Sequence, residues 1–68
     1  MLTRTQFKIY MLIVTKAMGE RDIATMLNAK LSSVKRRTKE IFDVMGVSSR
    51  LELLIQYWYR ELHPQEAH

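Results

Sequence analysis

Residues 33–50 read SVKRRTKEIFDVMGVSSR, and this stretch decides the fold. Five of the eleven basic residues of the chain lie between Lys30 and Lys39, and no acidic residue interrupts them. Apolar residues recur through the same region at helical spacing, at Leu31, Val34, Ile41, Phe42 and Met45. A helix with this pattern buries one face in a core and presents a strongly positive face on its other side.

The segments around this basic helix predict an all-α domain of four helices. A short amphipathic segment, residues 20–27, precedes the basic helix, and residues 28–30 form the turn between the two. A short helix, a turn and a basic helix are the layout of a helix-turn-helix DNA reader. We expect helices over residues 3–18, 20–27, 31–45 and 49–62, with the end of the first helix frayed and no strand.

Local signals indicate where these helices begin and end. Thr3 with Gln6 fits a capping box, in which each side chain bonds to the backbone N–H of the other residue, and Ser49 with Glu52 fits a second one. Gly46 suits a left-handed helix stop. The four predicted helices are therefore bounded by signals that act within a few residues.

Composition predicts one small domain over residues 1–63, followed by a short tail over residues 64–68. The formal net charge is +4 and the sequence pI is near 9.8. There is no cysteine, and His63 and His68 lie at the tail, so we expect neither a metal nor a cofactor. No catalytic constellation is present, which argues against an enzyme. The lack of cysteine suits a reducing cytoplasm, so we expect a cytoplasmic protein. We expect no membrane span, because no apolar run approaches about 18 residues.

Four short motifs are similar to those of one family. Residues 2–6 (LTRTQ) stand where the family has Leu-Thr-x-x-Glu, and residues 22–27 (DIATML) where it has Glu-Ile-Ala-x-x-Leu. Residues 33–35 match its Thr-Val-Lys, and residues 41–50 match its Ile-x-x-x-Leu-Gly-Val-x-x-Arg. The chain thus resembles the LuxR/GerE-type helix-turn-helix DNA-binding domain of bacterial transcription regulators, from residue 2 to about residue 58. The resemblance implies a helix-turn-helix at the second and third helices and a C-terminal dimerisation helix.

The basic helix supplies the candidate DNA-binding residues. Lys35, Arg36 and Lys39 are expected to point away from the core stripe, and in the resembling family these positions face the major groove. There, lysine and arginine can donate to guanine or to phosphates. The alternative is a solvated charged face. We favour DNA contact, because four like charges within residues 35–39 repel one another unless a ligand offsets them.

Neighbouring positions are expected to hold backbone phosphates or to support the fold. The further candidates for DNA binding are Lys30, Ser33, Arg37 and Arg50. For Arg50, a phosphate contact and a brace to the basic helix are equally compatible with the sequence. Thr38 falls on the core side of the helix and is expected to be structural.

The last predicted helix is unusually apolar. One face carries Leu51, Ile55, Trp58 and Leu62. Leu53 and Tyr57 lie well away from that face. Because one small core cannot cover so wide an arc, we expect Leu53 and Tyr57 to form the pairing surface of a homodimer, as this helix often does in the resembling family. The alternative is that both are simply part-exposed.

The first predicted helix carries two apolar stripes. By analogy with the family, the core positions are Ile9, Tyr10, Leu12 and Ile13. Phe7 and Met11 are apolar where the family is commonly polar, and they are in phase with Val14 and Met18. We expect Phe7 and Met11 to form a partner surface. If the helix is rotated instead, this second stripe is the core.

These features predict sequence-specific binding of double-stranded DNA in transcription regulation, by a homodimeric reader without a cofactor. The alternative is a small interaction protein that uses the same fold to bind and modulate another transcription regulator or RNA polymerase, as an anti-activator or heterodimer partner. The basic helix favours the first function. The Phe7 and Met11 stripe and the apolar last helix favour the second. Since Met1 directly precedes the domain, we expect a free-standing regulator or an excised reader.

Overall fold

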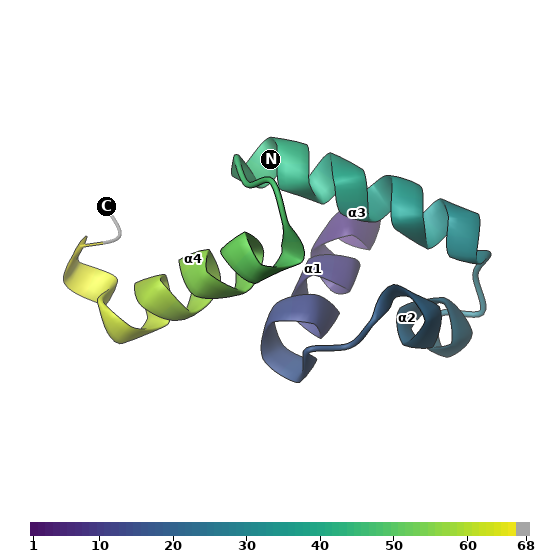
Figure 1. The fold of residues 1–68 in the computed structure, drawn as a ribbon, viewed down its shortest axis with the longest axis horizontal. Helices are drawn as coiled ribbons and strands as arrows, with labels where there is room; N and C mark the ends of the chain where they lie inside the picture. The colour runs from purple at the N-terminus through teal and green to yellow at the C-terminus, as the bar shows by residue number, and fades with distance from the viewer. Residues whose placement is uncertain (67–68) are drawn as a thin grey trace.

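The computed structural model describes residues 1–66, which form four α-helices and no strand (Figure 1). The helices are α1 (Arg4–Lys16), α2 (Glu20–Met26), α3 (Leu31–Met45) and α4 (Arg50–Leu62), and a short 3-10 helix, η1 (Pro64–Glu66), follows. The predicted all-α class is confirmed, and all four predicted helices are present. The rest of the predicted tail, which includes His68, lies outside the described residues.

Helix α1 begins with the predicted capping box and ends earlier than predicted. The Thr3 hydroxyl accepts from the Gln6 N–H at 3.2 Å, and Gln6 Oε1 accepts from the Thr3 N–H at 2.9 Å. At the other end, Ala17 adopts a left-handed φ of 52°. A left-handed residue stops a helix and directs the chain away from its axis. Helix α1 therefore ends at Lys16 in a defined turn rather than in a frayed last turn.

A tight turn joins α2 to α3 in a helix-turn-helix arrangement. Three backbone bonds close it: Leu27 N–H to the Ile23 carbonyl at 2.9 Å, Asn28 N–H to Thr25 at 3.2 Å, and Ala29 N–H to Ala24 at 2.9 Å. Asn28 has a φ of 52°, which asparagine tolerates because its short polar side chain bonds locally. The turn is thus held by its own backbone, and α3 begins directly after it.

The connection from α3 to α4 follows the sequence signals with one shift. Gly46 takes a φ of 72° and ends α3 as predicted. The Ser49 hydroxyl accepts from the Glu52 N–H at 3.2 Å, as expected of the helix cap. The Glu52 carboxylate, however, accepts from the Ser48 N–H instead of the Ser49 N–H. The second predicted capping box is therefore reciprocal, but its returning bond lies one residue upstream.

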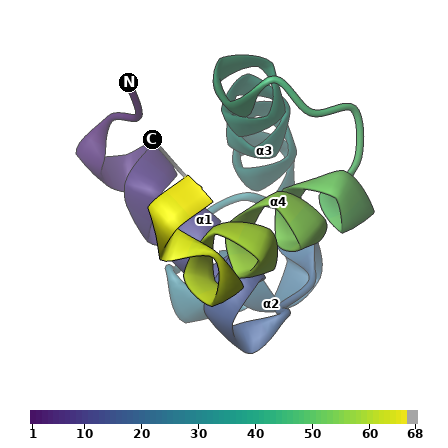
Figure 2. The ribbon, with the colours of Figure 1, turned by 90° about the vertical axis from the view of Figure 1, so that its left-hand side faces the viewer.

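Helices α1, α2 and α3 enclose a small core, and the first turn of α4 completes it (Figures 1 and 2). The buried apolar side chains are Ile9, Tyr10, Ile13, Val14, Ile23, Ala24, Val34, Ile41 and Leu53. Each large side chain in such a core stabilises the fold by about 1.5–3 kcal/mol. Leu53 is the fully buried α4 residue in this set, and Leu54 and Tyr57 pack against the core, so α4 contacts it along about its first two turns.

Beyond that contact, α4 extends outward and makes the molecule elongated, with extents of 38 × 20 × 20 Å (Figure 1). Two side-chain donors attach α4 to backbone carbonyls of other helices. Trp58 Nε1 donates to the Val14 carbonyl at 3.1 Å, and Gln56 Nε2 donates to the Met45 carbonyl at 3.0 Å. These bonds set the rotation of α4 about its own axis, and thereby which of its apolar residues face solvent.

Candidate nucleic-acid interface

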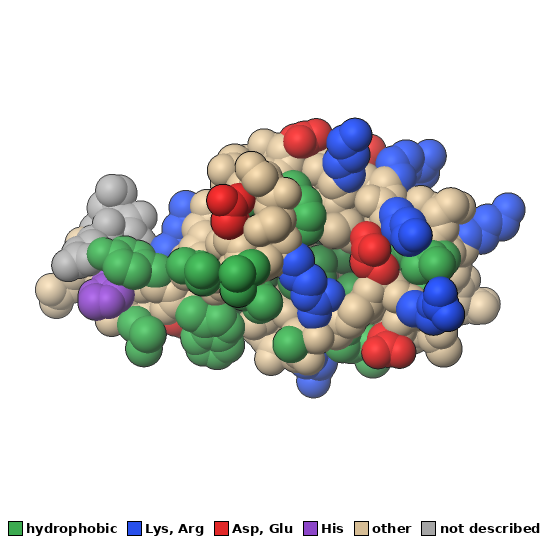
Figure 3. Space-filling model, viewed as in Figure 1, with side chains coloured by type: hydrophobic (Ala, Val, Ile, Leu, Met, Phe, Trp, Pro, Cys, Tyr) green, Lys and Arg blue, Asp and Glu red, His purple; other side chains and the backbone are tan. Residues whose placement is uncertain are grey.

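The outward side of α3 carries three cations close together, and we call Lys35, Arg36 and Lys39 the basic face. All three side chains are exposed, whereas Val34 and Thr38 on the opposite side of the helix are buried. Lys and Arg side chains gather mostly over α2 and α3 in Figure 3. The expected separation of a core side from a positive side is therefore present in α3.

Thr38 is structural, as predicted. Its hydroxyl donates to the Val34 carbonyl one turn earlier at 2.8 Å, and its side chain is buried. A buried hydroxyl without a partner would destabilise the fold, and this bond satisfies it within the helix. Thr38 can therefore lie on the inner side of α3 without an unpaired polar group in the core.

The basic face is free to meet a ligand. Within residues 1–65, no hydrogen bond or ion pair engages the side chains of Lys35, Arg36 or Lys39. Like charges so close together repel one another, and an anionic partner relieves that repulsion. Three adjacent cations without partners are therefore available to phosphates or to base edges.

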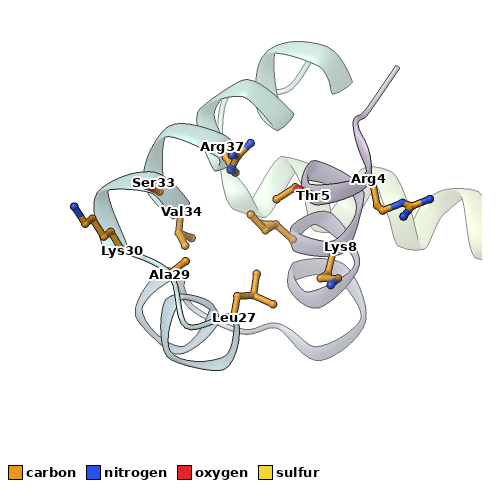
Figure 4. Close-up of a pocket in the computed structure, with 10 residues that line it drawn as sticks. Arg4, Thr5, Lys8, Leu27, Ala29, Lys30, Ser33, Val34 and Arg37 are labelled. Atoms are coloured by element: carbon orange, nitrogen blue, oxygen red, sulfur yellow. The ribbon is translucent and has the colours of Figure 1, made fainter.

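Three other predicted phosphate contacts lie at the α1 side of α3. Lys30 is the residue before the first turn of α3, and its side chain is exposed. Ser33 and Arg37 are half-buried and follow on the same side of the helix. All three border a hollow between α1 and α3 (Figure 4). They form a second basic region beside the basic face, and the two regions together cover more than half of the length of α3.

Arg50 acts as a brace, though not to the helix that we expected. Its guanidinium donates to the Met18 carbonyl, in the connection between α1 and α2, and its side chain is half-buried beside Glu20 and Phe42. It therefore ties the start of α4 to the end of α1. Of the two readings that the sequence left open for Arg50, support of the fold is the one that its contacts favour.

The expected pairing surface at Leu53 is wrong. Leu53 is 0% exposed and belongs to the core, so it cannot contact a second chain in the folded protein. Tyr57 is half-buried, and its ring meets Tyr10 edge-on at a centroid distance of 6.1 Å. Burial raises the pKa of the Tyr10 hydroxyl above its ordinary value of 10.0. Leu53 and Tyr57 are thus on the inner side of α4, turned toward α1.

The face of α4 that we expected to be inside is the one exposed to solvent. We call Leu51, Ile55, Trp58 and Leu62 the outer α4 stripe. Leu51 is 66% exposed, Ile55 59% and Leu62 75%. Hydrophobic side chains form a continuous strip over α4 in Figure 3. Helix α4 does carry more apolar surface than the core covers, as predicted. The covered side, however, is that of Leu53 and Tyr57, and the uncovered side is the outer α4 stripe.

The second stripe of α1 is divided between surface and core. Phe7 is 53% exposed, whereas Val14 is 1% exposed and lies in the core. Met11 and Met18 are half-buried and pack against the core. Phe7 therefore remains an exposed apolar residue, while the rotated-helix alternative holds for Val14. Among the core positions expected by analogy, Leu12 is only half-buried.

Two basic residues of α1 were missed. Arg4 and Lys8 are exposed, and both border the same hollow as Lys30 and Arg37. Their spacing of four residues places them on one side of α1, which is a signal that the sequence contains. It does not reveal that this side faces α3, because that depends on how the two helices pack.

Comparison with protein-family profiles, curated proteins and solved structures finds no match for this chain. The resemblance to the LuxR/GerE-type domain therefore stays a prediction that rests on its four motifs. None of the helices within residues 1–66 combines the length and the apolar character needed to cross a membrane.

Proposed function

We propose that this protein binds double-stranded DNA with sequence specificity and regulates transcription. The observation that carries the proposal is the basic face, three exposed cations without partners on the second helix of a helix-turn-helix arrangement. Recognition helices of this arrangement lie in the major groove. The proposal places the protein where DNA is, in the cytoplasm of a bacterium, as the resemblance to bacterial regulators implies.

The proposed docking assigns different roles to the two basic regions of α3. Lys35, Arg36 and Lys39 enter the major groove, which is about 12 Å wide and admits one helix. There they donate to guanine O6 and N7 or to flanking phosphates. Lys30 and Arg37 lie on a different side of α3, and they hold the sugar-phosphate backbone at the groove edge. Ser33 adds a hydroxyl donor between them.

We also propose that two copies pair through the outer α4 stripe. Its members are spaced by four, three and four residues, which is the seam spacing of a two-helix coiled coil. Leu51, Ile55 and Leu62 are each more than half exposed in the single chain. Pairing would bury this apolar surface, and a small domain gains stability from such burial. Two α3 helices in one dimer would read two half-sites of a palindromic operator.

The test is a selection of duplexes from a random pool, followed by affinity measurements at 50 and 200 mM salt. A single enriched motif is expected. Lys35→Ala or Lys39→Ala should cost about 1–3 kcal/mol of binding free energy if the side chain reads a base. A residue that contacts only phosphate should instead reduce the salt slope by about one unit. Lys16→Ala, at the end of α1, is the matched control and should leave affinity nearly unchanged.

The outcome against the proposal is equally definite. The triple variant Lys35→Ala, Arg36→Ala and Lys39→Ala removes charge only from exposed positions, so its helical circular dichroism should equal that of the unmodified chain. If this folded variant binds duplex DNA as tightly as the unmodified chain, the basic face has no role in DNA binding. If the selection enriches no motif, the protein does not bind DNA with sequence specificity.

A second candidate function is favoured by Phe7. Its exposed ring begins a row of aromatic contacts, with Tyr10 at 6.3 Å and then Tyr57, which crosses from α1 to α4. A small interaction protein that binds another transcription regulator or RNA polymerase would use such a surface together with the outer α4 stripe. The absence of duplex binding at low salt, combined with heterodimer formation that Phe7→Ser abolishes, would favour this function.

A further inference from the structure

A hollow of about 620 Å³ lies between α1 and α3, to one side of the basic face (Figure 4). The first two turns of α1 form one wall, the first two turns of α3 form the other, and the turn after α2 closes one end. The volume falls within the range of about 300–1,000 Å³ that is typical of sites for small molecules. Its lining combines basic and apolar side chains.

The rim of the hollow is positive and rich in donors. Its polar side chains are Arg4, Thr5, Lys8, Lys30, Ser33 and Arg37. None of the lining residues is acidic. In Figure 4, the tips of Arg4 and Lys30 point outward on opposite sides of the hollow. Arg37 is half-buried, whereas Arg4, Lys8 and Lys30 are exposed. Guanidinium groups bind phosphate and carboxylate oxygens through two parallel hydrogen bonds.

The floor of the hollow is apolar. It consists of Ile9, Leu27, Ala29 and Val34. Ile9 and Val34 are 1% exposed and belong to the core, so they form the fixed base of the floor. Leu27 and Ala29 come from the turn and offer apolar surface to a ligand. A sugar-phosphate backbone is polar and would leave these side chains uncovered, whereas a ligand with an apolar body would cover them.

The positions of these residues follow from helical geometry. One side of α3 carries residues that follow Lys30 by three, four and seven positions. These residues are Ser33, Val34 and Arg37. Residues 4, 5, 8 and 9 are aligned in the same way on α1. The two sides face each other across the hollow. The site is therefore built by the packing of two helices, and it differs from the basic face, whose side chains point away from α1.

We propose that the hollow binds a small organic anion, a molecule with an apolar body and one phosphate or carboxylate group. The apolar body covers the floor, and the anionic group meets Arg37 and Lys8 at the rim. Such a ligand would give the protein a chemical signal that acts within the DNA reader itself. The hollow shares Lys30, Ser33 and Arg37 with the proposed contacts to the DNA backbone, whereas none of the basic face lines it. A binding experiment without DNA therefore tests the ligand separately from the proposed DNA binding.

The experiment uses octyl phosphate below its micelle concentration as the probe, and follows backbone amide resonances of the whole chain by NMR without any DNA. Resonances of Thr5, Ala29 and Ser33 should shift together and saturate. Inorganic phosphate and 1-octanol, which each carry half of the probe's chemistry, should bind at least about tenfold more weakly. A further titration with adenosine monophosphate compares the affinity for a phosphate on a nucleotide with the affinity for a phosphate on a lipid-like molecule.

Matched pairs of variants locate the site. Arg37→Gln should weaken octyl phosphate binding about tenfold, as expected when a charged hydrogen bond is lost. Arg36→Gln makes the same chemical change one residue away, on the basic face, and should change the dissociation constant less than twofold. Lys8→Gln and Lys16→Gln form a second pair on α1. Helical circular dichroism confirms that each variant is folded.

Three results would overturn the proposal. Equal affinity for inorganic phosphate and octyl phosphate would show that only the rim binds, as in a DNA backbone contact. Equal affinity for 1-octanol would show that the cations have no role. Resonance shifts confined to Leu51, Ile55 and Leu62 would place the probe on the outer α4 stripe instead. None of these results bears on whether the basic face binds DNA.

Discussion

Helices α3 and α4 have similar lengths, 15 and 13 residues, yet they present opposite chemistry to solvent. The outward side of α3 carries Lys35, Arg36 and Lys39, whereas that of α4 carries Leu51, Ile55, Trp58 and Leu62 (Figure 3). Exposed charge is stable in water without any partner. Exposed apolar surface in a continuous strip gains free energy when something covers it.

The comparison teaches how far each kind of surface can be inferred. A lysine or arginine has only one stable place in a small domain without partners, the surface, because burial of an unpaired charge is very costly. A leucine has two, because many apolar side chains on small domains remain exposed. The outward side of α3 was therefore predictable, and that of α4 was not.

The largest effect is expected where α4 meets the core. Leu53→Ala should lower the free energy of unfolding by about 2–5 kcal/mol, because it removes a fully buried side chain and leaves a cavity. Leu51→Ala, two residues earlier on the outer α4 stripe, should change it by less than about 0.5 kcal/mol. Urea denaturation followed by circular dichroism measures both. Similar losses for the two variants would mean that the inner and outer sides of α4 are not distinct.

A smaller effect is expected from the outer α4 stripe, and only on association. Ile55→Gln with Leu62→Gln should weaken self-association at least about tenfold, because two apolar side chains would no longer be buried between chains. The stability of the single chain should hardly change. Sedimentation equilibrium over a concentration series measures the association. Lys35→Gln with Lys39→Gln is the matched control on α3, and it should leave association intact while it weakens DNA binding.

An unmodified chain that stays monomeric at high concentration, both alone and on duplex DNA, would contradict pairing through α4. The outer α4 stripe would then be either a partner surface for a different protein or simply exposed. The contrast between the two helices would remain as a structural fact, with a function assigned only to α3.

The smallest effect is expected at the residue that joins the two helices. Gly46 has a φ of 72°, and nothing lies within 4 Å of the place where a Cβ would stand. Gly46→Ala should therefore cost about 1–2 kcal/mol through backbone strain alone. Gly46→Asn should cost less, because asparagine tolerates this conformation. Thermal melts of the two variants measure the difference. Equal costs would mean that strain at the left-handed φ of residue 46 is not the cause of the loss.

By itself, the sequence determined the features that depend on neighbours along the chain. The cap at Thr3, the stop at Gly46 and the bounds of α3 follow from bonds that span a few residues, and all three are present. The helical period also places Thr38 on the inner side of α3, opposite the charged residues of the basic face. The all-α class follows from the same patterns. The resemblance to a DNA-reading family remains a prediction, as does the function.

Only the tertiary structure decided what depends on contacts between helices. Helix α4 is apolar on two sides, so its polar residues alone do not say which apolar side faces the core. Contacts such as the bond from Trp58 to Val14 decide that Leu53 lies inside. The hollow likewise requires Arg4 and Lys8 of α1 to meet the start of α3. The physical reason is that periodicity reports which residues share a side of a helix, whereas packing alone determines what that side faces.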